Sequence, residues 1–211
     1  MNPIRLLIAD DSTEMRRDLR MILALEKDIQ VVAMARDGVE AVDLAAKHQP
    51  DVALMDLDMP KMNGLEAMRQ IADRSPGTVC LVVSAEGDRS FVQQAMKAGA
   101  REYFVKPVVP DDLIAAIRRA ATAAGTVKQK LAAVQEVEAK KDQYLIKLAE
   151  VYAKDKRTDD EAVQVYEDLA ARPNCDQQWL ITLAVAYLAR HEWGKLKTLA
   201  DRLEKLAGSG G

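Results

Sequence analysis

Short apolar runs alternate with amphipathic segments over the first 120 residues of the chain. The apolar runs are rich in valine, isoleucine and leucine, as strands buried on both faces are; they cover residues 4–9, 31–35, 52–55, 79–83 and 102–105. Between them, apolar residues recur at helical spacing, for example at Met15, Leu19 and Ile22. Five strands alternating with five helices predict a parallel sheet with helices on both faces, a doubly wound α/β domain.

Two helix starts are marked by capping residues. Asp11 precedes a first turn that contains Glu14, and Pro110 opens the last amphipathic segment of this region. Acidic residues in the first turn and proline at the first helical position are typical of helix N-termini. We therefore expect helices to begin close to residues 12 and 110.

The pattern of apolar and polar residues changes after about residue 124. From there on, the spacing of the apolar residues predicts helix throughout. A 4/3 spacing continues from the fifth predicted helix, is interrupted by Glu138 and Lys141, and then resumes. One interpretation is a single continuous helix that forms a dimeric coiled coil. The interpretation that we favour is two helices that separate near Gly125 and Thr126, because the alanine-rich stripe provides poor coiled-coil contacts.

Residues 144–207 contain an internal repeat. Leu145, Leu148, Ala149 and Tyr152 recur 35 residues later as Leu180, Leu183, Ala184 and Tyr187. A repeated helix pair of this length resembles the tetratricopeptide repeat, although alanine stands where the consensus has glycine. Thr158 and Glu161 predict a capping box for the second helix of the first pair, and Pro173 with Asn174 predicts its end.

Composition and charge narrow the function. Apolar residues make up 49% of the chain and the net charge is −3, without the basic excess of a phosphate-backbone binder, so nucleic acid is not an expected partner. Cys80 and Cys175 are too few for a disulfide framework. The N-terminus does not resemble a secretory signal, and no run reaches the roughly 18 apolar residues of a membrane span. We expect a cytoplasmic protein.

Polar residues terminate four of the predicted strands. Asp10 and Asp11 follow the first strand, Asp56 the third, Ser84 the fourth and Lys106 the fifth. The carboxyl ends of parallel strands meet at one edge of the sheet, which is where open α/β sheets bind ligands. These five side chains are therefore expected to converge.

The chemistry of this group of side chains is restrictive. Three neighbouring carboxylates repel one another unless a cation compensates them, and oxygen ligands with room for water suit Mg²⁺. With Asp10 and Asp11 holding the metal, Asp56 stays ionised and can attack a phosphoryl group to give an acyl phosphate. Lys106 and the Ser84 hydroxyl would then contact the oxygens of the transferred group.

The motifs LIADDS, LMDLDMPKMNGLE, VVSA and GAREYFVKP together resemble the receiver domain of two-component response regulators, over residues 3–122. The resemblance implies a CheY-like, flavodoxin-like (βα)5 fold. It makes Asp56 the phospho-acceptor and Asp10 and Asp11 the acidic pair that binds Mg²⁺, with Asp58 supplying a backbone carbonyl to the metal and Lys106 binding the phosphoryl group.

The resemblance also assigns the switch. Ser84 is the hydroxyl switch residue and Tyr103 the switch aromatic, which would turn inward after phosphorylation. Gly64 would fill a turn before the third helix. The Lys106–Pro107 peptide bond is expected to be cis, as in similar domains.

The predicted function is that of a response regulator. A sensor histidine kinase or phosphotransfer protein would phosphorylate Asp56, and the receiver would switch a helical protein-interaction module with a downstream protein partner or as a homodimer. No enzymatic activity beyond self-dephosphorylation is expected. The alternatives are a transcriptional regulator with an atypical helical DNA-binding region, or a fragment of a longer signalling protein of a pilus, flagellar or chemotaxis pathway.

These assignments predict four segments. Residues 1–123 form the receiver, 124–143 a helical linker, 144–207 an all-α domain like the tetratricopeptide repeat, and 208–211 a flexible tail.

Overall fold

The computed structural model describes residues 2–172 and 175–208, with side chains up to residue 202. The chain divides into two compact units, Met1–Ala133 and Val134–Gly211, and this division falls inside the predicted linker. Helix α5 (Pro110–Lys154) contributes residues to both units. Each unit is described by itself.

The first unit is built on a five-stranded parallel sheet in the order β2-β1-β3-β4-β5. The strands are β1 (Ile4–Ala9), β2 (Ile29–Ala35), β3 (Val52–Met55), β4 (Val79–Ser84) and β5 (Ala100–Val105). The connecting helices are α1 (Thr13–Leu23), α2 (Gly38–His48), α3 (Gly64–Arg74) and α4 (Arg89–Lys97), and α5 follows β5. The predicted order of elements is confirmed, although β2 and β5 each begin two residues earlier than expected.

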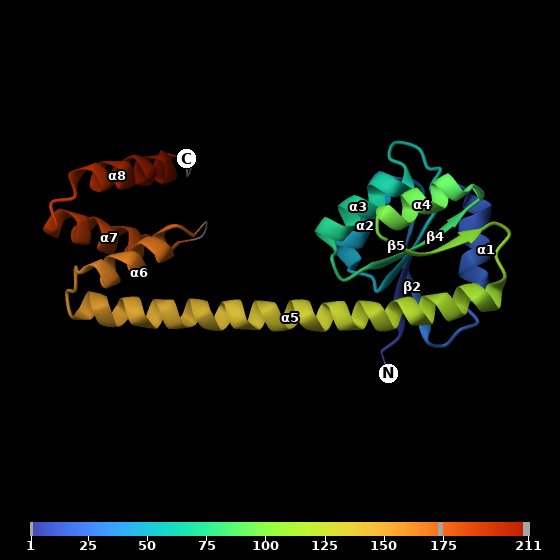
Figure 1. Cartoon of the computed structure of the whole chain (residues 1–211), viewed down its shortest axis with the longest axis horizontal. Helices are drawn as coiled ribbons and strands as arrows, with labels where there is room; N and C mark the ends of the chain where they lie inside the picture. The colour runs from blue at the N-terminus through green and yellow to red at the C-terminus, as the bar shows by residue number, and fades with distance from the viewer. Residues whose placement is uncertain (1, 173–174, 209–211) are drawn as a thin grey trace. The chain divides into compact units, whose positions relative to one another are not determined.

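Helices cover both faces of the sheet (Figure 1). On one face, Leu6 and Ile8 of β1 pack with Leu19 of α1 and Ile117 of α5. On the other face, the alternate β1 residues Leu7 and Ala9 belong to a second apolar cluster, to which α2, α3 and α4 contribute. The alternation along β1 therefore supplies both cores, as the doubly wound prediction requires.

Both helices begin close to the expected residues, but the capping residue of α1 differs from the prediction. Pro110 is the first residue of α5, as expected. The N-cap of α1 is Ser12 and not Asp11, because the Ser12 hydroxyl accepts a hydrogen bond from the Met15 backbone N–H at 3.3 Å. Asp11 is exposed and makes no such cap, so its carboxylate is left for another role.

The favoured break near Gly125 and Thr126 is wrong, because α5 runs through both residues as one helix. Glycine costs roughly 1 kcal/mol relative to alanine inside a helix, and the alanine-rich turns before it offset this cost. Within the helix, Thr126 donates its hydroxyl to the Thr122 carbonyl oxygen at 3.2 Å. Within the first unit, Lys128 of α5 also bonds to Asp51, just before β3, at 2.6 Å.

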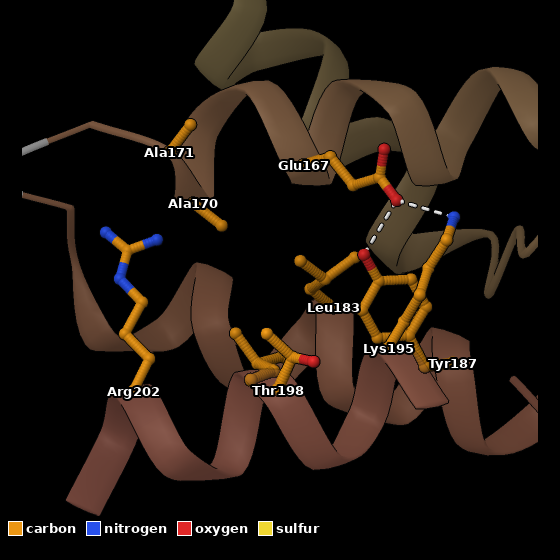
Figure 2. Close-up of a pocket in the computed structure, with 9 residues that line it drawn as sticks. Glu167, Ala170, Ala171, Leu183, Tyr187, Lys195, Thr198 and Arg202 are labelled. Carbon is orange, nitrogen blue, oxygen red and sulfur yellow. Dashed lines mark hydrogen bonds and ion pairs between the residues drawn. The ribbon is translucent and has the colours of Figure 1, made fainter. Parts of the chain in front are cut away.

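The second unit consists of the end of α5 with α6 (Asp160–Ala170), α7 (Gln177–Ala189) and α8 (Trp193–Gly208). Repeat positions Ala149, Tyr152, Leu180 and Tyr187 lie in its apolar core. Figure 2 shows the Glu167 carboxylate of α6 joined to helices α7 and α8: it accepts hydrogen bonds from Tyr187 at 2.7 Å and Lys195 at 3.0 Å.

The predicted capping box at Thr158 is wrong by one residue. Asp159 caps α6 by accepting from the Ala162 backbone N–H at 3.2 Å. Glu161 pairs instead with Arg157 at 2.9 Å. An ionised side chain one position later thus replaces the expected hydroxyl.

Three predictions concern the remaining parts of the chain. The stop at Pro173 and Asn174 lies outside the described residues. Of the predicted tail 208–211, Gly208 is instead the last residue of α8, and residues 209–211 lie outside the described residues. Across residues 2–172 and 175–208, no helix has the length and apolar character to cross a membrane.

Candidate functional site

The five residues predicted to converge all lie at one edge of the sheet. Asp10 and Asp11 directly follow β1, Asp56 follows β3, Ser84 is the last residue of β4, and Lys106 follows β5. Because β1 and β3 are neighbours in the sheet, the Asp10 and Asp56 carboxylates are brought together at its centre. Register fixes this proximity, since Ala9 pairs with Met55.

Lys106 joins two of the acids. Its ammonium lies 2.7 Å from Asp10 Oδ2 and 2.6 Å from Asp56 Oδ2. The side chains are well shielded, with exposed fractions of 16% for Lys106, 3% for Asp10 and 7% for Asp56. Charged groups with so little water contact require compensation from one another.

Burial and hydrogen bonding shift two pKa values at this site. Burial raises the pKa of the Asp10 carboxyl above its ordinary value, against the hydrogen bonds from Lys106 and Ser12, which lower it. Burial lowers the pKa of the Lys106 ammonium, but hydrogen bonds to Asp10 and Asp56 outweigh this effect and the pKa is raised. Lys106 is therefore a cation throughout the physiological range.

Asp10, Asp11 and Asp56 form a cluster whose carboxylate oxygens lie within 4.8 Å of one another. A single ammonium leaves three carboxylates undercompensated, so the cluster favours an additional cation. Its donors are all hard oxygens, and exposed Asp11 leaves one side open to water. This donor set fits a divalent ion such as Mg²⁺.

The Asp56 carboxylate is oriented by the loop that follows it. Its Oδ1 accepts from the backbone N–H groups of Leu57 at 2.6 Å and Asp58 at 3.4 Å, while Oδ2 accepts from Lys106. Gly64 lies against the same loop: a Cβ added there would be 2.0 Å from the Asp56 carbonyl oxygen. Gly64 is thus required by close approach of two backbone segments.

Ser84 and Tyr103 both contact the loop after β4. The buried Ser84 hydroxyl accepts from the Glu86 backbone N–H at 3.4 Å. The half-buried Tyr103 donates its hydroxyl to the Glu86 carbonyl oxygen, and burial raises the pKa of this phenol. The expected cis peptide between Lys106 and Pro107 is confirmed.

Two further interactions near this edge of the sheet were not predicted from the sequence. The Arg16 guanidinium donates to the carbonyl oxygens of Asp10 and Asp11. Lys61, in the loop after β3, pairs with the buried carboxylate of Asp37. The only sequence signal for Arg16 is a basic residue in the first turn of a helix, where a cation is unfavourable.

Comparison with known proteins identifies the family. Residues 6–118 match the response regulator receiver domain, so the chain belongs to the response regulator receiver family. It is 40% identical over 130 residues to the transcriptional regulatory protein DegU of Brevibacillus brevis, covering 62% of this chain and 55% of DegU. It is 38% identical to the chemotaxis protein CheY of Listeria monocytogenes, covering 56% of this chain and 98% of CheY.

A solved structure agrees with this assignment. The crystal structure of the CheX–CheY–BeF3–Mg²⁺ complex of Borrelia burgdorferi matches with a TM-score of 0.51 and 29% identity, covering 54% of this chain and 85% of that chain. The chain spans little more than half of DegU and nearly all of CheY. The residues that match the receiver domain, 6–118, thus correspond to most of the length that the chain shares with either relative.

Proposed function

We propose that this protein is a phosphorylation-dependent response regulator in which Asp56 accepts a phosphoryl group. The observation that carries the proposal is the Lys106 ammonium placed between Asp10 and Asp56, beside the three-carboxylate cluster. The donor is a phosphohistidine of a sensor histidine kinase or phosphotransfer protein. An Asp56 oxygen bonds to phosphorus as the phosphorus–nitrogen bond breaks, which leaves an acyl phosphate on Asp56.

Each residue has a defined role in this reaction. Asp10, Asp11, Asp56 and the Asp58 backbone carbonyl would hold Mg²⁺, which when bound supplies charge neutralisation for the phosphoryl oxygens. Lys106 balances the charge of the group once it is on Asp56.

The switch involves two further residues. Ser84 moves its hydroxyl toward the phosphoryl group, and Tyr103 leaves the Glu86 carbonyl oxygen and turns inward. Hydrolysis of the acyl phosphate returns the receiver to its starting state, and no other enzymatic activity is assigned to the chain.

Beryllofluoride, a mimic of the phosphoryl group, tests the acceptor site without a kinase. In ¹⁹F NMR, the wild-type protein should give a bound beryllofluoride signal that requires Mg²⁺ and disappears with EDTA. Asp56→Asn removes the oxygen to which beryllium binds and should give no bound signal. A Mg²⁺-dependent signal that persists in this variant would overturn the assignment of Asp56.

We also propose that residues 144–207 form a protein-interaction module like the tetratricopeptide repeat. A cavity of about 520 Å³ in this unit supports the proposal; α7 contributes Ile181 and Val185 to it, whose exposed fractions are 54% and 58%. The charged residues that line the cavity, Lys156 and Arg157, are basic. The buried Tyr166 hydroxyl at its wall has no hydrogen-bond partner among the described residues. The exposed side chains of Ile181 and Val185 suit an apolar segment of a downstream protein partner, and the polar residues beside them suit hydrogen-bond acceptors on that segment.

A transcriptional role is the second candidate, because DegU is a transcriptional regulatory protein. The basic residues of α8 give this candidate little support. Lys195 is paired with Glu167 and Glu192, so its charge is largely compensated. A gel shift with genomic DNA that weakens steeply with salt would favour DNA binding, and we expect none.

A further inference from the structure

The Arg16 side chain of α1 binds the backbone of Asp10 and Asp11, two of the clustered acids. Its guanidinium donates to the Asp10 carbonyl oxygen at 2.7 Å, to the Asp11 carbonyl oxygen at 3.0 Å and to the Thr13 hydroxyl at 3.0 Å. Among the hydrogen bonds of the described residues, these two carbonyl oxygens receive theirs from Arg16. One side chain thus fixes the segment between β1 and α1.

The helix dipole and a bound divalent cation would both act against the positive charge of Arg16. It lies in the first turns of α1, where the helix dipole disfavours cations. It also lies next to a cluster that attracts a divalent cation and would repel that cation. The planar guanidinium, with donors in a fixed fork, suits an arrangement of several acceptors that an ammonium does not match.

The neighbouring residue Arg17 provides a contrast. It carries the same charge on the same helix, and within the described part of the chain it is exposed and has no hydrogen bond to residues 10–13. The contacts of Arg16 are therefore specific to its position and do not follow from a generally basic helix.

We propose that Arg16 is a positioning residue for the divalent-cation site. It holds the Asp10 and Asp11 backbone so that both carboxylates stay within reach of Asp56. The inference rests on the proposed function of this site, because it assumes that the acids bind Mg²⁺. It adds that the geometry of the acidic pair depends on a residue outside the acids and Lys106.

The direction of the change in Mg²⁺ affinity shows whether Arg16 acts through its hydrogen bonds or through its charge. Removing a positive charge near a cation site by itself strengthens cation binding. A loss of Mg²⁺ affinity on replacing Arg16 must therefore come from the lost hydrogen bonds. Residues that orient metal ligands typically contribute about 10-fold or more to affinity.

The experiment is isothermal titration of Mg²⁺ alone into the full chain, with circular dichroism as the check on folding. Arg16→Ala and Arg16→Lys should each weaken Mg²⁺ binding by about 10-fold. The lysine variant keeps the charge and loses the fork, so it also decides the case if the alanine variant fails to fold. Arg17→Ala, which removes the same charge one residue away, should bind Mg²⁺ as the wild type does or slightly more tightly.

Each result has one meaning. Wild-type affinity in Arg16→Lys overturns the positioning role while leaving the acidic site intact. A similar loss in Arg17→Ala also overturns it, since the effect would then not depend on the hydrogen bonds that Arg16 makes to residues 10–13. Absence of Mg²⁺ binding in the wild type would instead contradict the proposed function itself.

Discussion

The ammonium of Lys106 lies 2.6 Å from Asp56 Oδ2, although the two residues are 50 positions apart in the chain. The contact joins the carboxyl ends of β5 and β3, and β4 lies between these strands. It places a fixed positive charge beside a carboxylate that is 7% exposed. The ammonium can therefore balance the charge of a group transferred to Asp56 without reorganising water.

Removing one carboxylate from the acidic cluster should reduce the repulsion between the others and make the folded protein more stable. Asp11→Asn removes one of three carboxylates whose oxygens lie within 4.8 Å of one another. Without Mg²⁺, we expect the free energy of unfolding of this variant to be about 1 kcal/mol higher than that of the wild type. Adding Mg²⁺ should stabilise the wild type more than the variant. Chemical denaturation with and without Mg²⁺ measures both effects, and a less stable variant in metal-free buffer would contradict the repulsion argument.

Gly64 and Gly125 should respond oppositely to alanine. In Gly64→Ala the new Cβ would meet the Asp56 carbonyl oxygen, a backbone atom that cannot move freely. We expect a loss of about 1–3 kcal/mol in the free energy of unfolding. In Gly125→Ala nothing lies within 4 Å of the Cβ, and the better helix former should stabilise α5 by up to about 1 kcal/mol. If urea denaturation showed the same change in the free energy of unfolding for both variants, this prediction would be refuted.

Asp37 should contribute to acid sensitivity. The Glu40 backbone N–H and the Lys61 ammonium hold the pKa of Asp37 below its ordinary value of 3.8. The carboxylate therefore stabilises the fold above pH 3.8, and this contribution disappears as the pH falls through the lower, folded-state pKa. Asp37→Asn keeps a capping side chain but should lose stability less steeply over that range. Thermal melts of the wild type and Asp37→Asn from neutral pH downward test this, and the same pH dependence in both proteins would contradict it.

The state of Asp56 should change the behaviour of the helical module. We expect beryllofluoride with Mg²⁺ to change either the mass measured by light scattering or the set of proteins retained by the immobilised chain. Asp56→Asn should show no response to beryllofluoride. Identical mass and identical retained proteins in both wild-type states would count against a switch that acts through dimerisation or exposure.

The sequence predicted much of the site because its signals are local. Four of the apolar runs stop at candidate site residues, and parallel topology brings these residues to one edge of the sheet. The positions of Asp10, Asp56 and Lys106 therefore follow from the sequence. The hydrogen bonds of Arg16 were not predictable in this way. They depend on the turn that folds α1 back onto the end of β1, and a single basic residue does not reveal which carbonyl oxygens it meets.

Two predictions of helix boundaries were wrong for a related reason. Gly125 indicates a break when its propensity is considered alone, but a cost of roughly 1 kcal/mol is small against the alanine-rich turns that precede it. The cap of α6 moved from Thr158 to Asp159 because Arg157 and the Ala162 backbone N–H both bind the carboxylate. Competition among several contacts decides such boundaries, and the order of residues alone does not express it.

The most direct measurement of the central claim is to locate the phosphoryl group. The full chain is treated with acetyl phosphate and Mg²⁺, reduced with borohydride to trap an acyl phosphate, digested and analysed by mass spectrometry. The account predicts a single modified residue, Asp56, with no modification in EDTA or in Asp56→Asn. Modification at another residue, or equal labelling of Asp56→Asn, would contradict it.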